Sequence, residues 1–177
     1  MKHLTLALFL FFPVLCYGQK GFAPKGYILS VEFPGSYEVS EITEKSILDV
    51  FKQPYHAAVY SSDDNKLTLT GIFGTYRQDK SPKTQLIRMS MVKEMARSMK
   101  KEVAGKFFFE EYFEIGPAGS GASFTLSKGK GTVPVLNVML MVIENKLYLF
   151  SGRLRDLKYQ QEVLKFMQSA TNNLFTK

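Results

Sequence analysis

Cysteine, histidine and tryptophan are scarce in this chain. Its 177 residues include one cysteine, two histidines and no tryptophan. Cys16 and His3 both lie near the amino terminus, so the chain beyond residue 18 has no thiol and a single imidazole. This excludes disulfides, a cysteine nucleophile and the common zinc sites from that part. The 15 phenylalanines and 9 tyrosines of the whole chain, most of them beyond residue 18, indicate that aromatic packing supplies the stability instead.

Long apolar runs are also lacking, except at the start. Lys2 precedes the apolar stretch 4–16, LTLALFLFFPVLC. This run is about 13 residues long, whereas a membrane-spanning helix needs about 20. It fits the apolar region of a secretory signal peptide. Cys16 and Gly18 supply small residues at the −3 and −1 positions of a cut after residue 18.

The amino-terminal pattern defines the expected domain organisation. We expect residues 1–18 to be a cleavable signal peptide and residues 19–177 to be one domain, periplasmic or secreted. Cys16 also allows a lipoprotein interpretation, in which its thiol is acylated. Leu15 occupies the position where a lipobox normally has a small residue. We therefore expect no lipid anchor at Cys16.

The charge of the chain is moderately basic. One of its 23 lysines and arginines, Lys2, lies in the predicted leader, which leaves 22 against 16 aspartates and glutamates, a formal charge of +6. For an exported protein, this charge favours a protein partner or an anionic envelope component over nucleic acid. An even distribution of the same charge would serve solubility alone.

Hydrophobic periodicity predicts the secondary structure of the rest. Alternating or β-branched runs bounded by turn residues predict strands. Apolar residues at helical spacing predict one helix over 81–101, with Ser81 as its cap, and a final helix that begins near Asp156. The predicted strands are 27–33, 55–61, 66–77, 107–115, 122–128, 133–143 and 146–154.

The order of these elements predicts an α+β fold. Strand–helix–strand alternation is missing, which disfavours a parallel sheet. We expect an antiparallel β-sheet flanked by a central and a C-terminal amphipathic helix. On the central helix, Met91, Met95 and Met99 share one side, which we expect to pack on the sheet. The apolar side of the final helix is predicted to carry Tyr159, Val163, Phe166, Met167, Ala170 and Leu174.

This arrangement resembles the PsbP-like fold family. The matching features are an early strand that ends in Phe33-Pro34-Gly35, a hairpin before the central helix, the long strand 107–115, the segment Leu147–Phe150 and a closing helix. Members of that family include photosystem-associated extrinsic subunits, envelope lipoproteins of the DcrB type and secretion-associated chaperones. The resemblance implies a small binding or assembly protein, without a cofactor and not an enzyme.

Two motifs resemble catalytic signatures only superficially. Residues 116–123, GPAGSGAS, resemble a phosphate-binding loop, but Ala122 occupies the lysine position and a strand follows, where that loop needs a helix. We interpret it as a turn. His56 lies in a strand-like run, and no nucleophile-elbow pattern accompanies it. We interpret it as a packed or surface histidine and expect neither a catalytic triad nor a metal site.

Three carboxylates on one predicted strand leave an enzymatic alternative open. Strand alternation places Glu110 and Glu114 on one side and Glu111 on the other, among apolar neighbours. Glu111 is therefore the unusual carboxylate. One interpretation pairs it with Arg88 of the central helix, and another makes it a catalytic acid.

The strongest candidate partner surface lies at the junction of the last strand and the final helix. Arg153, Arg155 and Lys158 cluster there, with Tyr148 upstream. We predict that these four residues contact a protein or an anionic envelope component, the alternative being a solvated edge. The leading functional hypothesis is an exported non-enzymatic binding or assembly module. The alternatives are a small-ligand or lipid carrier with a cavity between sheet and helix, and a glycan-directed hydrolase.

Overall fold

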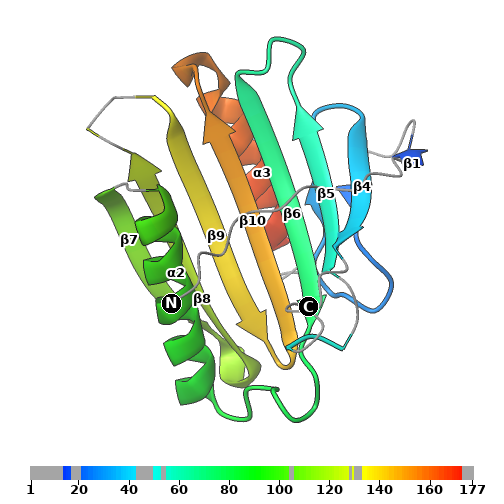
Figure 1. Ribbon diagram of the computed structural model, residues 1–177, viewed down its shortest axis with the longest axis vertical. Coiled ribbons are helices and arrows are strands. Elements are labelled where there is room, and N and C mark those ends of the chain that lie inside the picture. Colours follow the sequence, from blue (N-terminus) through cyan, green and yellow to red (C-terminus); the bar gives the residue numbers. More distant parts are fainter. Residues whose placement is uncertain are drawn as a thin grey trace.

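A large antiparallel sheet forms the body of the molecule (Figure 1). The structure is a computed structural model that describes residues 14–16, 21–42, 50–52, 55–103, 106–127, 129 and 133–172. Eight of the described strands form one sheet, in the order β1-β4-β5-β6-β10-β9-β8-β7. Their bounds are β1 Val14–Cys16, β4 Tyr37–Ile42, β5 Tyr55–Ser61, β6 Leu67–Thr75, β7 Lys106–Ile115, β8 Gly119–Ser127, β9 Val135–Ile143 and β10 Lys146–Leu154.

The sheet is built from two meanders that meet at its centre. Strands β4, β5 and β6 follow one another as hairpins, and so do β7, β8, β9 and β10. The two halves join where β6 pairs with β10, in a register that sets Gly71 opposite Phe150. Between the halves, the chain passes through helix α2, Gln85–Val103. The fold is therefore α+β with an antiparallel sheet, as the order of elements predicts.

Part of the predicted leader belongs to this sheet. Strand β1 pairs with β4, with Val14 opposite Val39, and is the outermost strand on that side. The rest of the leader lies outside the described residues. Residues beyond position 18 form the other seven described strands of the sheet, so its hydrogen-bonded ladder is continuous from β4 to β7 without β1.

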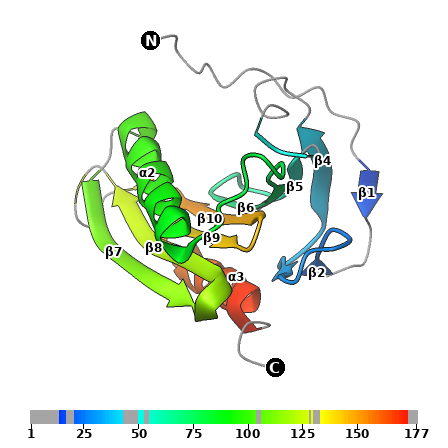
Figure 2. The same cartoon turned by 90° about the horizontal axis from the view of Figure 1, so that it is seen from below.

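The two helices lie on opposite faces of the sheet (Figure 2). Helix α2 packs on β8 and β9, whereas α3, Gln160–Asn172, packs on β10 and β3. A one-turn 3-10 helix, η2, Leu157–Tyr159, leads into α3, and the Asp156 carboxylate caps it by accepting from the Lys158 amide. Within the described part of the chain, neither helix is long and apolar enough to cross a membrane.

A small second sheet completes the α3 side. It pairs β2, Gly21–Phe22, with β3, Val31–Glu32. The predicted strand 27–33 is thus wrong over most of its length. The physical reason is that other groups satisfy its backbone, since the Tyr27 amide donates to the Pro24 carbonyl and the Ile28 amide to the Tyr148 hydroxyl.

Two apolar clusters, one on each face, hold the layers together. The α3 cluster contains buried aromatic rings of the large sheet and the helix, among them Phe73, Tyr148, Phe150 and Phe166. The predicted apolar side of the final helix is confirmed for its described members, and Leu174 lies outside the described residues. On the other face, Met91, Met95 and Met99 pack against the α2 cluster, which confirms the predicted orientation of the central helix.

The start of α2 differs from the prediction. The helix begins at Gln85, and the Thr84 hydroxyl, not Ser81, accepts from a helix amide, that of Ile87 at 3.3 Å. Arg88 explains the delay, because its guanidinium donates from Nη1 to the Pro82 carbonyl at 3.0 Å and holds the preceding segment out of the helix. Its Nη2 donates to the Pro117 carbonyl at 2.9 Å. Arg88 therefore links two loops.

The predicted pairing of Arg88 with Glu111 is wrong. Arg88 is a buried residue of α2 on one face of the sheet, whereas strand alternation turns Glu111 to the α3 face, where its side chain is exposed. The sheet itself therefore separates the two groups. The carbonyl groups of Pro82 and Pro117 accept from the Arg88 guanidinium in place of a carboxylate. Hydrogen bonds from a charged donor are strong, so these two stabilise the buried guanidinium.

Candidate functional site

The site begins with the small residues of β8. The β8 residues on the α3 face are all glycine, serine or threonine, namely Gly119, Gly121, Ser123, Thr125 and Ser127. Where β7 supplies a large neighbour, that neighbour fills the space, as the Phe113 ring does over Gly121. Over Ser123 and Thr125 the space stays open. The sequence of β8 therefore creates a hollow on this face.

Helix α3 forms the opposite wall of the hollow. Its buried side chains, Val163, Phe166, Met167 and Ala170, face the core. Gln160, Leu164, Gln168 and Thr171 recur at intervals of three or four residues and form a neighbouring stripe that faces β8 and β9. Because α3 packs on β10, the side of the helix that faces β8 has no large side chains of β8 to pack against.

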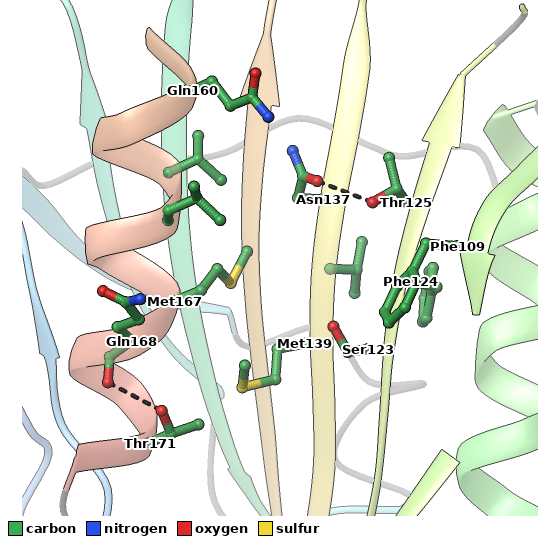
Figure 3. Close-up of a pocket in the computed structure, with 13 residues that line it drawn as sticks. Phe109, Ser123, Phe124, Thr125, Asn137, Met139, Gln160, Met167, Gln168 and Thr171 are labelled. Atoms are coloured by element: carbon green, nitrogen blue, oxygen red, sulfur yellow. Dashed lines mark hydrogen bonds between the residues drawn. The ribbon is translucent and has the colours of Figure 1, made fainter. Parts of the chain in front are cut away.

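Together these walls enclose a groove of about 300 Å³ (Figure 3). None of the 13 described residues that line it carries a charge. Phe109 of β7 and Leu164 of α3 belong to its lining and are 52% and 45% exposed, unusually open for large apolar side chains. The remaining lining residues include Val138, Met139 and Met167. The groove is an uncharged, mostly apolar surface.

Hydrogen-bonding groups gather at one end of this groove. The Thr125 hydroxyl donates to Oδ1 of Asn137 at 2.9 Å across the β8–β9 pair. That bond fixes the amide of Asn137, whose nitrogen points away from Thr125, on the side of Gln160 (Figure 3). A ligand here would meet the neutral amides of Asn137 and Gln160 beside the small hydroxyl side chains of β8. The lining offers contact surface and hydrogen bonds, and it includes no carboxylate, imidazole, amine or thiol.

The structure does not bring the four predicted partner residues together. Tyr148 is fully buried in the α3 cluster, and burial raises the pKa of its phenol to about 12. Arg153 is exposed on the other face of the sheet, and Arg155 follows at the strand end. Lys158 donates to an Asp64 carboxylate oxygen at 3.1 Å. Arg153 and Arg155 are exposed, Lys158 is engaged by Asp64, and none of the three forms one surface with Tyr148.

Asp64 ties the β5–β6 turn to the start of α3. Its carboxylate accepts from the Ser62 hydroxyl at 2.8 Å, from Lys158 Nζ and from the Lys66 amide. The hydrogen bond from Ser62, followed by that from Lys158, holds the pKa of this carboxyl well below its ordinary value of 3.8. Because Lys158 lies in η2, this cluster positions the first turn of the helix that forms the groove wall.

Asp64 should make stability depend on pH in the acid range. Its pKa is lower in the folded chain than in the unfolded chain, so it stabilises the fold above about pH 4, and that contribution is lost as the pH falls further. We expect Asp64→Asn to lower the urea midpoint at pH 7 and to approach the unmodified protein below pH 3. Glu114→Gln, in the edge strand β7, is the control, because it also removes one negative charge but lies far from the β5–β6 turn in the strand order. Parallel curves for Asp64→Asn and the unmodified protein would contradict this assignment.

The residues of the enzymatic alternative lie apart. The β7 register places Glu110 and Glu114 on the α2 face, where Glu110 accepts from the Tyr112 hydroxyl, and Glu111 on the α3 face. His56 Nδ1 lies 3.5 Å from Glu41 Oε1, and the His56 ring packs edge-on against Tyr27. Among the described residues, no three histidine, cysteine or acidic side chains gather as a metal site.

Sequence reasoning missed the groove, although one signal for it was present. The alternate small residues of β8 are visible in GSGASFTLS, but their meaning depends on which helix faces them. The turn interpretation of residues 116–123 is confirmed only for Gly116–Ala118, which form a 3-10 turn, and is wrong for residues 119–123, which already belong to strand β8. Compared with protein-family models and with curated proteins, the chain matches none.

Proposed function

We propose that this chain is an exported, non-enzymatic binding protein that holds an uncharged, largely apolar small ligand in the groove between α3 and β8. The observation that carries the proposal is the groove itself, about 300 Å³ in volume and lined by 13 uncharged residues. Clefts that are mostly apolar and have a few convergent polar groups are the usual form of small-molecule sites. The export of the chain rests on its amino-terminal pattern.

The size and polarity of the groove limit the class of ligand. Its volume is at the lower end of the range for ligand sites, which favours one ring system or a short chain over a lipid with two acyl chains. Burying an ion among uncharged side chains is costly, so a charged ligand is disfavoured. Asn137 and Gln160 at one end favour a ligand with a neutral carbonyl, hydroxyl or amide group there.

The resemblance to the PsbP-like family favours the same functional class, because most members bind or assemble and few catalyse. Fold resemblance alone does not identify a ligand. A protein partner that inserts an apolar side chain between Phe109 and Leu164 is the second candidate, favoured by the exposure of both residues. The two candidates differ in whether a small probe saturates the site by itself.

The test uses N-phenyl-1-naphthylamine, an uncharged aromatic probe that fluoresces in apolar surroundings. We expect saturable binding to the protein with one site per chain. Ser123→Leu fills the floor of the groove and should weaken binding at least about tenfold, which corresponds to about 1.4 kcal/mol of lost contact. Ser123 is only partly buried, so the variant should fold.

Ser151→Leu is the matched control. Ser151 is also a partly buried serine on a strand, but it faces the α2 side of the sheet. We expect its affinity for the probe to stay within about twofold of the unmodified protein, a difference below 0.5 kcal/mol. Unsaturable binding, or equal weakening by both variants, would refute the small-ligand proposal. If the probe does not bind, and a protein partner binds the unmodified protein but not Ser123→Leu, the second candidate is favoured.

A further inference from the structure

The outer face of α2 begins with two unusually exposed apolar residues. Leu86 is 81% exposed and is the most open of the large apolar side chains described, and Ile87 beside it is 46% exposed. The methionine side of α2 already packs on the sheet, so these residues are not part of the core. An adjacent pair of open aliphatic side chains at one helix end is an apolar tip on the surface.

Positive charge extends from the segment before this tip along α2 to its last turn. Between residues 80 and 101, seven lysines and arginines stand against one acidic residue, Glu94, whereas the whole chain has 23 against 16. Arg88 is buried, and the other six cations are exposed. Those six are Lys80, Lys83, Lys93, Arg97, Lys100 and Lys101.

The fold sets this surface on the outside of the molecule. Figure 2 shows α2 standing outside β7, β8 and β9, on the face opposite α3. On this face of the sheet, Glu110 and Glu114 belong to the edge strand β7, next to the strands β8 and β9 on which the helix packs. Asp79 in the preceding loop is occupied by Arg77, whose Nε lies 3.2 Å from its carboxylate. The outer face of α2 therefore keeps an excess of cations.

From this combination, we infer that the outer face of α2 binds an anionic lipid surface. Leu86 and Ile87 enter the boundary between headgroups and acyl chains, and the six exposed cations contact lipid phosphates. Basic helices with an apolar contribution bind membranes in this way, because electrostatic attraction and apolar burial add. A nucleic acid would make no use of an aliphatic tip, and a protein partner would call for a concave or aromatic surface.

The inference goes beyond the proposed function and uses a different surface. Because α2 and α3 lie on opposite faces of the sheet, binding through α2 turns the groove away from the membrane. The groove then stays open to the aqueous phase. A protein bound in this orientation would take up or deliver its ligand beside the membrane without leaving it.

The absence of tryptophan allows a direct test. In Leu86→Trp the reporter is the only indole of the chain. With vesicles of phosphatidylglycerol and phosphatidylcholine, we expect its emission to shift to the blue and brominated acyl chains to quench it. Pure phosphatidylcholine vesicles should produce neither change, and added salt should weaken both. Leu157→Trp, at a residue 49% exposed in η2, is the matched control and should stay unquenched.

Co-sedimentation with the same vesicles separates the two contributions. We expect Lys83→Glu/Lys101→Glu to reduce partitioning at least about tenfold, and Leu86→Gln to reduce it less, with a weaker response to salt. Arg155→Glu should change little. Equal binding to both vesicle types would indicate insertion of the leader, and quenching at Leu157 or unchanged binding of the charge variant would overturn the inference. All these variants should bind the groove probe normally, so failure here leaves the proposed function intact.

Discussion

Replacing Phe166 by alanine should lower the free energy of unfolding by about 3–5 kcal/mol, the usual cost of deleting a buried phenylalanine ring. Phe166 is 2% exposed and belongs to the buried side of α3. Its ring lies 5.2 Å from that of Phe33 and 6.4 Å from that of Phe150. It therefore joins the segment directly after β3, the helix and the large sheet. Urea unfolding followed by circular dichroism measures the loss.

The control for this variant comes from the same helix. Leu164 is 45% exposed, so Leu164→Ala should cost well under about 1 kcal/mol, since a half-open side chain leaves no sealed cavity. It should nevertheless weaken probe binding, because Leu164 lines the groove. Similar stability losses for the two variants would show that α3 does not dock as described.

Gly152→Ala should also destabilise the protein, by about 1–3 kcal/mol, through overpacking. A Cβ at this position of β10 would meet the Val163 methyl groups at 2.7 and 2.8 Å. Gly152 therefore allows α3 to approach the sheet closely, and any side chain there must displace Val163 or the helix. Chemical denaturation again gives the difference in unfolding free energy.

A second substitution makes the Gly152 prediction specific. In Gly152→Ala/Val163→Ala the crowding is removed, so the double variant should lose less stability than the two single variants summed, with a coupling of about 1 kcal/mol or more. Gly21→Ala, where the nearest atom lies 3.8 Å from the added Cβ, should cost less than Gly152→Ala. Additive effects would mean that Gly152 and Val163 are not in contact.

These contacts also determine the groove. The separation of α3 from β10 fixes how far Leu164 and Gln168 stand from β8, so a displaced helix changes the volume of the site. Gly152→Ala should therefore alter probe affinity even though Gly152 is not a lining residue. The stability of the α3 face and the binding capacity of the groove thus depend on the same packing.

Elements with strong local signals were predictable from the sequence. The hairpin before α2 and the strands from β7 to β10 follow from alternation and turn residues. Glu144, which takes a positive φ of 53°, lies in the turn between β9 and β10. The apolar sides of α2 and α3 follow from helical periodicity. Local chemistry also identified Asp156 as the cap before the last helix.

Long-range relations were not predictable from these patterns. The pairing of β6 with β10 joins residues that are far apart in the chain, and periodicity gives each helix an apolar side without saying which sheet face it meets. For that reason the sequence did not predict that Arg88 and Glu111 lie on opposite faces of the sheet, or that Tyr148 is buried. Predicting the groove requires both the small residues of β8 and the position of α3. The second of these is known only from the structure.

The most direct test of the central claim maps the groove probe on the protein itself. In amide chemical-shift titrations with N-phenyl-1-naphthylamine, we predict saturable changes at Ser123, Thr125 and Asn137 and along the Gln160–Thr171 flank of α3, with α2 unaffected. Changes centred on Leu86 and Ile87, or no saturable change in any part of the described chain, would contradict the assignment of the groove as the binding site.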